Sequence, residues 1–201
     1  MFGYLNQYED QVYDALRSVS EAAIAEAASA LADVYRRRGT LFVLCPPEDG
    51  ADVDRFVHEL GRDIGGGPSG FRLVELFGSP RQIVAWQNDW AYEDIYAEQM
   101  RGRIRRGDAV IAVTRRGDTA NVVHALQAAR ALGARTIALV GAAGTAVHDV
   151  ADITLRVGSE QAGQVQAAQM MLEQMLCAAL QRVLAQAAER ADRAAGAAPA
   201  L

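Results

Sequence analysis

The strongest constraint on the fold is a repeated alternation of short, mainly apolar runs with longer segments of helical periodicity. The runs, which predict β-strands, occupy 40–44, 71–76, 109–113, 136–140 and 153–157. Helical spacing occupies 4–38, 50–64, 91–106, 120–132 and 159–188, and Ser79-Pro80 begins a further short helix. Strands that are apolar on both faces and alternate with helices are typical of a parallel sheet covered on each side. The sequence therefore predicts an α/β fold with a central parallel sheet of about five strands.

The helical pattern before the first strand marks an N-terminal segment, residues 1–38. It ends as helices commonly end, with Arg36, Arg37 and Arg38 followed by Gly39. Residues 39–190 contain all the predicted strands and form one domain, of a size that a single hydrophobic core can support. The end of the chain, residues 191–201, is rich in Ala, Gly and Pro and is predicted to be disordered.

Composition excludes several classes of function. The net charge is −5, which argues against direct nucleic-acid binding through a broad basic face. No apolar run reaches the roughly 18–20 residues of a membrane span, and the N-terminus lacks an export signal, so we expect a cytoplasmic protein without membrane contact. All 20 basic residues are arginine, which rules out lysine Schiff bases and the Walker-type lysine. Cys45 and Cys177 are too few for a metal cluster and are expected to be reduced, buried thiols.

One turn carries an anion-binding pattern. A helical pattern begins at Ala120, and the run at 109–113 reaches it through Thr114, Arg115, Arg116, Gly117, Asp118 and Thr119. A strand that delivers a Gly-containing, hydroxyl-bearing turn to a helix N-terminus presents unpaired backbone N–H groups, and the helix dipole there favours negative charge. Two guanidinium groups add donors that suit phosphate or carboxylate. The pattern predicts a site for a phosphorylated small molecule; the alternative is an ordinary turn with two solvated arginines.

This turn belongs to a wider resemblance. The segments 88–96 (NDWAYEDIY), 107–113 (GDAVIAV) and 117–122 (GDTANV) resemble the sugar isomerase (SIS) domain family, with weaker support from Asp152, Gln166 and Cys177. The similarity is to the branch that contains phosphoheptose isomerases and the DnaA initiator-associating protein, and it covers nearly the whole chain. It implies a flavodoxin-like three-layer sandwich and a homotetramer or homodimer in which the helices of residues 1–38 pack together. It also implies a phosphorylated sugar, or a related anionic small molecule, as ligand.

The sequence departs from the family around the sugar. Family members usually carry a Gly-Asn-Gly-Gly-Ser-type loop after the first strand, whereas this chain has CPPEDG at 45–50. Prolines lack N–H donors and the acidic pair repels phosphate, so this loop should not cradle the sugar as the family's loop does. Asp89 matches a family position near the sugar, where it could accept hydroxyl hydrogen bonds; a helix N-cap is its alternative role.

The catalytic positions also differ. In the heptose isomerases a His and a Glu on the second helix, with a Gln and a His on the last helix, hold zinc or carry protons. The matching positions here are Arg55 and Glu59, then Gln166 and Gln174, so no metal or other cofactor is expected. Arg55 and Glu59 are four residues apart on a predicted helix and should pair, which suits Glu59 poorly to shuttling protons. His58 could substitute as a ligand, and the two glutamines suit a pocket completed by a partner's last helix.

These observations leave three functions. The leading hypothesis is a phosphosugar-binding protein that lacks ordinary heptose isomerase activity and acts as a binding or regulatory subunit. The second is an isomerase of sedoheptulose 7-phosphate or a related ketose phosphate, in which Glu59 and Gln174 are the catalytic residues of a rebuilt site. The third is a protein-interaction module resembling the DnaA initiator-associating protein. The sequence alone therefore leaves open whether the chain is an enzyme.

Overall fold

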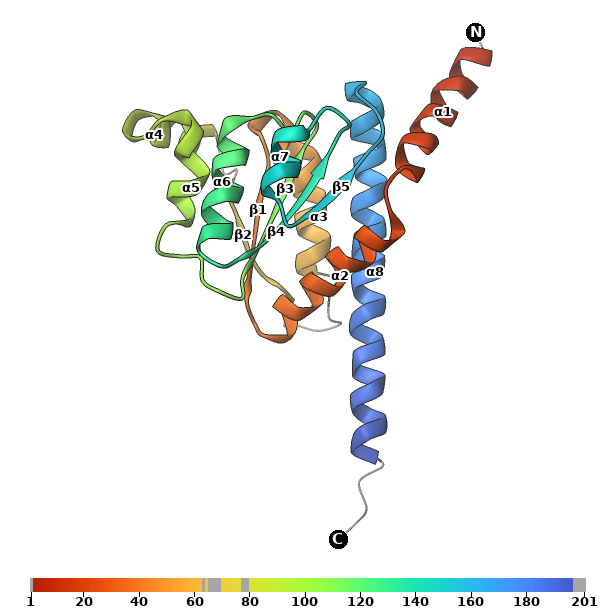
Figure 1. Ribbon diagram of the computed structural model, residues 1–201, viewed down its shortest axis with the longest axis vertical. Helices are drawn as coiled ribbons and strands as arrows, with labels where there is room; N and C mark the ends of the chain where they lie inside the picture. The colour runs from red at the N-terminus through yellow and green to blue at the C-terminus, as the bar shows by residue number, and fades with distance from the viewer. Residues whose placement is uncertain (1, 63, 65–69, 77–79, 197–201) are drawn as a thin grey trace.

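A computed structural model describes residues 2–62, 64, 70–76 and 80–196. Its centre is a five-stranded parallel sheet in the order β2-β1-β3-β4-β5 (Figure 1). The strands are β1 (Thr40–Leu44), β2 (Arg72–Glu75), β3 (Ala109–Thr114), β4 (Arg135–Val140) and β5 (Ile153–Arg156). This order with parallel pairing is that of flavodoxin-like folds. The predicted α/β architecture and its five strands are confirmed.

Helices cover both faces of the sheet and make a three-layer sandwich (Figure 1). One face carries α2 (Glu21–Arg36), α3 (Gly50–Arg62) and α8 (Ala162–Gly196), and α1 (Phe2–Arg17) packs against α8 and directs its N-terminus away from the sheet (Figure 1). The other carries α4 (Pro80–Asp89), α5 (Ile95–Met100), α6 (Ala120–Ala131) and α7 (Thr145–Val150). Successive residues of a strand alternate between these layers: Leu41 and Val43 pack into the first core, and Phe42 and Leu44 into the second. The central strands are therefore apolar on both faces except at their ends.

The helical region predicted for residues 4–38 is confirmed and contains two helices, the second of which begins where Ser20 accepts a hydrogen bond from the Ala23 N–H at 3.4 Å. Other helix boundaries differ from the prediction. The helix predicted for 91–106 ends at Met100, and Gly102 adopts a left-handed φ of 73°. Helix α7 was not predicted, since six residues are too few for helical periodicity to be recognised.

The chain ends differently from the prediction as well. Helix α8 continues to Gly196, so the predicted start of a disordered tail at residue 191 is wrong. The rest of the predicted tail, 197–201, lies outside the described residues. The lower half of α8 extends beyond the sheet (Figure 1). No helix in the described part of the chain is both long and apolar enough to cross a bilayer.

The topology fixes where a ligand would bind. β1 pairs with β2 on one side and with β3 on the other. The chain leaves β1 toward α3 in one helical layer and leaves β3 toward α6 in the opposite layer. Open α/β sheets bind ligands at such a topological switch point, beyond the carboxyl ends of the strands. The turns after β1 and β3 therefore flank the candidate site.

Candidate functional site

The β3 turn, Thr114–Thr119, is fixed by hydrogen bonds and by close backbone packing. Thr114 is buried, and its Oγ1 accepts a hydrogen bond from the Gly117 N–H at 3.2 Å. Gly117 has a φ of 67°, and a Cβ there would lie 2.4 Å from Val140 Cγ2 and 2.6 Å from Gly144 Cα. Its carbonyl accepts a hydrogen bond from the Val147 N–H of α7 at 3.1 Å. Only glycine fits this position, and the turn is held in one conformation.

The N-terminus of α6 offers donors beside this turn. Thr119 occupies the N-cap position with an extended backbone, but its side chain makes no capping hydrogen bond. Within the described residues the backbone N–H groups of Ala120 and Asn121 have no acceptor. The Asn121 side chain is fully buried, and neither its amide nitrogen nor its amide oxygen has a partner among the described residues. Such a helix end suits an anion or a polar ligand. The sequence analysis did not select Asn121 as a site residue, although a polar residue next to the apolar Val122 could have indicated it.

Both arginines of the β3 turn are paired with carboxylates. Arg115 Nε donates to Oδ1 of the nearly buried Asp49 at 2.5 Å. Arg116 donates from Nε and Nη2 to Asp118 at 3.2 and 3.0 Å in an exposed pair. Burial raises the pKa of Asp49 while Arg115 opposes that shift, and hydrogen bonding from Arg116 lowers the pKa of Asp118. The two arginines that the sequence predicts to bind an anion are thus already paired with carboxylates. Arg115 forms an ion pair that joins the β3 turn to the β1 turn, and Arg116 forms a solvent-exposed ion pair within the β3 turn.

The β1 turn, Cys45–Asp49, presents a carboxylate instead of a cradle of N–H groups. Pro47 begins a single 3₁₀ turn that ends at Asp49. The buried Tyr96 hydroxyl donates to the Cys45 carbonyl at 2.6 Å. Burial raises the pKa of the Tyr96 hydroxyl and of the Cys45 thiol, so both groups stay protonated. Cys45 and Cys177 are both free and buried, as the sequence predicts.

A second polar cluster joins α3 to α8. Arg55 Nη1 donates to Glu59 Oε1 at 2.9 Å, as their spacing predicts, and Arg55 Nη2 lies 3.4 Å from Oε2 of Glu173. The second oxygen of Glu59 accepts a hydrogen bond from Gln174 Nε2. The Glu173 side chain is only 1 % exposed, so Arg55 offsets a buried charge. The structure brings Glu59 and Gln174 together within one chain; a contribution from a partner's last helix stays a prediction.

Comparison with known proteins identifies the family, since the model of the SIS domain matches residues 7–141. The chain belongs to the SIS domain family. This SIS domain is 28% identical over 174 residues to phosphoheptose isomerase from Geobacter sp. (strain M21), covering 87% of this chain and 91% of that protein. Among solved structures, a phosphoheptose isomerase from Francisella tularensis has a TM-score of 0.79 at 23% identity, covering 90% of this chain and 95% of that one. The Vibrio vulnificus NanR protein complexed with ManNAc-6P has a TM-score of 0.62 at 12% identity, covering 96% and 66%.

The α3–α8 cluster of this SIS domain does not fit a zinc ion. Zinc is bound by thiolate, imidazole and carboxylate donors, whereas a guanidinium carries positive charge and has no lone pair to donate. Here Arg55 occupies one oxygen of Glu59 and an amide N–H of Gln174 occupies the other. Among the residues that the structure describes, no three His, Cys, Asp or Glu side chains form a group that could hold a metal. The donor set therefore does not match the zinc site that the resemblance implies.

The structure places the remaining candidates apart from this cluster. Gln166 is half-buried and lies eight residues before Gln174 on α8, which is about 12 Å along a helix axis. Asp89 is exposed and is the last residue of α4, so it is not a helix N-cap; that position before the next helical turn is Ala91. His58 is exposed on α3 and lines a hollow with Leu73 of β2.

Two residues of α8 were missed by sequence reasoning although they had a signal. Gln169 is nearly buried, and its Nε2 donates to the Thr114 carbonyl at 3.0 Å, which supports the start of the β3 turn. Glu173 follows it by four residues, and both share the helix face of the buried Leu172 and Leu176. Polar residues at core positions of a periodic helix are the pattern that would have selected them.

Proposed function

We propose that this SIS domain binds a phosphorylated sugar in the crevice beyond β1 and β3 and acts as a binding or regulatory subunit without heptose isomerase activity. The phosphate would lie at the N-terminus of α6, where Ala120 and Asn121 have free backbone N–H groups and the Asn121 amide lacks partners among the described residues. Arg116 would turn toward it, because an exposed ion pair such as that with Asp118 contributes only about 0–1 kcal/mol. A protein of the same fold, NanR, has been solved with ManNAc-6P, which supports this ligand class.

The proposal that the protein does not catalyse isomerisation rests on the environment of Glu59. Aldose–ketose isomerisation requires a base that reaches a carbon-bound proton. One oxygen of Glu59 accepts a hydrogen bond from Arg55 and the other accepts one from Gln174. Arg55 is in turn held by Glu173 and by the Met170 carbonyl. Each oxygen of Glu59 is therefore held by a hydrogen bond, and this network would have to open for the carboxylate to move toward a carbon-bound proton.

One observation favours the alternative, an isomerase with a rebuilt site. Glu59 and Gln174, which the resemblance places in the catalytic centre, are in direct contact, and a relative along most of the chain is a phosphoheptose isomerase. For that function Arg55 would have to leave Glu59 when the sugar binds. The two functions therefore differ in one measurable property, which is turnover.

Turnover is tested by incubating the protein with sedoheptulose 7-phosphate, with and without added zinc, and following aldose formation. We expect no more aldose than in protein-free solution, because Arg55 and Gln174 hold the Glu59 carboxylate in their own hydrogen-bond network. Glu59→Gln is the control and should give the same trace as the wild type. Turnover by the wild type that disappears in Glu59→Gln would establish the isomerase instead.

Ligand binding is tested by thermal unfolding with sugar phosphates. A ligand at one hundred times its dissociation constant should add about 2.7 kcal/mol to the free energy of unfolding. Asn121→Ala should leave the free protein as stable as before or more so, because it removes a buried unpaired amide, and should reduce the ligand-induced shift. Arg116→Ala should also reduce the shift, whereas Arg193→Ala, which removes an equally exposed paired arginine from the end of α8, should not. A full shift in both Asn121→Ala and Arg116→Ala would contradict the phosphate position.

The homotetramer or homodimer implied by the resemblance stays a prediction. Its best candidate surfaces are on α1 and α8, which pack against each other. Large apolar side chains remain exposed on both helices: Tyr4, Leu5, Tyr13, Met170, Met171 and Met175. An assembly through these helices would cover them.

A further inference from the structure

Six arginines line one cavity at the amino edge of the sheet, the edge opposite the β1 and β3 turns. The cavity has a volume of about 800 Å³. It lies between the end of α2, the start of β2 and the loop between α5 and β3. These segments are at the lower edge of the sheet in Figure 1. Its one carboxylate among the described residues is Asp108. The arginines are Arg37, Arg38, Arg72, Arg103, Arg105 and Arg106.

The arginine cavity is built by close packing of two loops. A Cβ on Gly39 would lie 2.6 Å from the Gly107 carbonyl oxygen, so this glycine lets the loop after α2 touch the loop before β3. Asp108 then joins the two loops: its Oδ1 accepts from the Thr40 N–H and its Oδ2 from the Arg105 N–H, both at 2.7 Å. Both carboxylate oxygens are engaged by backbone donors. The fold therefore holds the arginine-bearing loops together without using their guanidinium groups.

Most of these guanidinium groups lack a counterion. In the described part of the molecule, no ion pair or side-chain hydrogen bond engages Arg37, Arg38, Arg72, Arg105 or Arg106. Arg103 donates only to the Gln99 carbonyl, at 3.5 Å. A concentration of free positive charge in a chain of net charge −5 marks a surface suited to anions.

Carboxylates in the neighbouring hollow do not neutralise this charge. Glu26, Asp33 and Asp152 line it together with Arg37 and Arg106. Each of the three is paired with another arginine: Asp33 with Arg36 at 2.9 Å, Glu26 with Arg135 at 2.7 Å and Asp152 with Arg130 at 3.3 Å. The free charge therefore belongs to the arginine cavity itself.

Arg38 occupies a backbone position where glycine is usual. Helix α2 ends in a Schellman motif, in which the Gly39 N–H donates to the Val34 carbonyl at 2.9 Å and the Arg38 N–H to the Tyr35 carbonyl at 3.0 Å. The left-handed residue of that motif is Arg38, with a φ of 55°, and not the glycine that follows it. A left-handed conformation is unfavourable for an L-residue because its Cβ crowds the following carbonyl oxygen. The chain thus carries an arginine at a position that the backbone alone would give to glycine.

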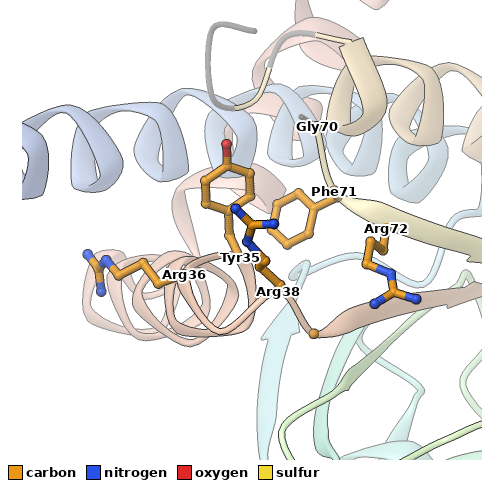
Figure 2. A pocket seen from close by; sticks show the side chains of 7 residues that line it. Tyr35, Arg36, Arg38, Gly70, Phe71 and Arg72 are labelled. Carbon is orange, nitrogen blue, oxygen red and sulfur yellow. The ribbon is translucent and has the colours of Figure 1, made fainter. Parts of the chain in front are cut away.

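An aromatic surface adjoins the arginines. A second cavity, of about 510 Å³, shares Arg38, Gly39 and Arg72 with the first. Figure 2 shows the rings of Tyr35 and Phe71 in this cavity together with the guanidinium groups of Arg38 and Arg72. The two rings meet edge to face, with centroids 5.3 Å apart. Aromatic faces stack on nucleobases, and guanidinium groups bind phosphate through paired N–H donors.

From this juxtaposition of five unpaired arginines with an aromatic pair, we propose a second binding site, for a nucleoside di- or triphosphate. The phosphate chain would lie across the arginine cavity and the base against Tyr35. Several cations in one concave site suit a ligand with several negative charges, and each of the two adjoining cavities has a volume within the range of small-molecule sites. A long nucleic acid is disfavoured because the rest of the chain is acidic. This site is at the opposite edge of the sheet from the sugar-phosphate crevice and does not depend on it.

Titration calorimetry with ATP, inorganic tripolyphosphate and AMP tests the proposal. We expect ATP to bind at least tenfold more tightly than AMP, and tripolyphosphate to bind more weakly than ATP. Arg72→Ala/Arg105→Ala should weaken ATP binding at least tenfold. The matched control Arg182→Ala/Arg190→Ala removes the same charge from exposed positions on α8 and should leave ATP binding unchanged.

Two single variants separate binding from folding. Arg38→Gly should weaken ATP binding several-fold while leaving the protein at least as stable, because glycine relieves the left-handed backbone. Tyr35→Leu should weaken ATP binding but not tripolyphosphate binding. Equal losses in the control double variant, AMP binding as tight as ATP binding, or tighter binding of an oligonucleotide would each overturn the proposal. Sugar-phosphate binding should be unchanged in all of these variants, so failure of one site is distinguishable from failure of the other.

Discussion

Replacing Gly117 with alanine is expected to lower the free energy of unfolding by about 3 kcal/mol, from backbone strain and overpacking together. Gly117 has a left-handed φ of 67°, a conformation that alanine adopts only at a cost. Its added Cβ would also lie 2.4 Å from Val140 Cγ2 and 2.6 Å from Gly144 Cα, so the strand or the loop must move. Because the β3 turn is packed on this contact, sugar-phosphate binding should fall with stability. Chemical denaturation followed by circular dichroism measures the effect.

Gly102→Ala is the matched control. Gly102 has a similar left-handed φ of 73°, but nothing in the described structure lies within 4 Å of the position of its Cβ. Its replacement should cost only the conformational strain, about 1 kcal/mol. The difference between the two variants isolates the close packing beneath the β3 turn. Equal losses in the two variants would mean that this contact contributes nothing.

The fold could be predicted because its signals are local. Each of the three central strands is a run with apolar residues on both faces, such as Leu41–Leu44, and each long helix repeats its buried residues every three or four positions. Helix α7 could not be predicted in this way. It is held by a contact, the Val147 N–H bond to the Gly117 carbonyl, that joins segments thirty residues apart. Tertiary hydrogen bonds of this kind leave no periodic trace in the sequence.

In the candidate site too, contacts between residues close in sequence could be predicted, and contacts between distant segments could not. The contact between Arg55 and Glu59 follows from four-residue spacing on one helix and was predicted. The ion pair between Arg115 and Asp49 joins residues 66 positions apart. It exists because the sheet places β1 beside β3, so their carboxyl ends meet. Sequence reasoning treated Asp49 as repelling phosphate and Arg115 as attracting it, without seeing that the two neutralise each other.

The pairing of Asp49 with Arg115 leads to the second large expected effect. Asp49→Asn should bind a sugar phosphate about tenfold more tightly, because it removes a negative charge from the crevice while its amide oxygen can still accept the Arg115 hydrogen bond. Two unit charges about 10 Å apart interact by about 1.7 kcal/mol at an effective dielectric constant of about 20, which corresponds to a little more than a factor of ten. Titration calorimetry measures the change. Asp14→Asn removes the same charge from an exposed position on α1 and should leave affinity unchanged.

The difference in free energy of unfolding between the wild type and Asp49→Asn should change with pH in a predictable direction. Burial raises the pKa of Asp49 above its ordinary value of 3.8, so the folded protein holds this proton more tightly than the unfolded chain does. The wild type should therefore lose stability relative to Asp49→Asn as pH rises from about 3.8 through the raised pKa. The opposite trend is expected against Asp118→Asn, because Arg116 lowers the pKa of Asp118 and its contribution is lost as pH falls. Denaturation of all three proteins between pH 3 and pH 7 compares the signs. If the wild type gained stability with rising pH relative to both variants, the Arg115 bridge would outweigh the burial of Asp49, and the folded protein would release this proton more readily than the unfolded chain does.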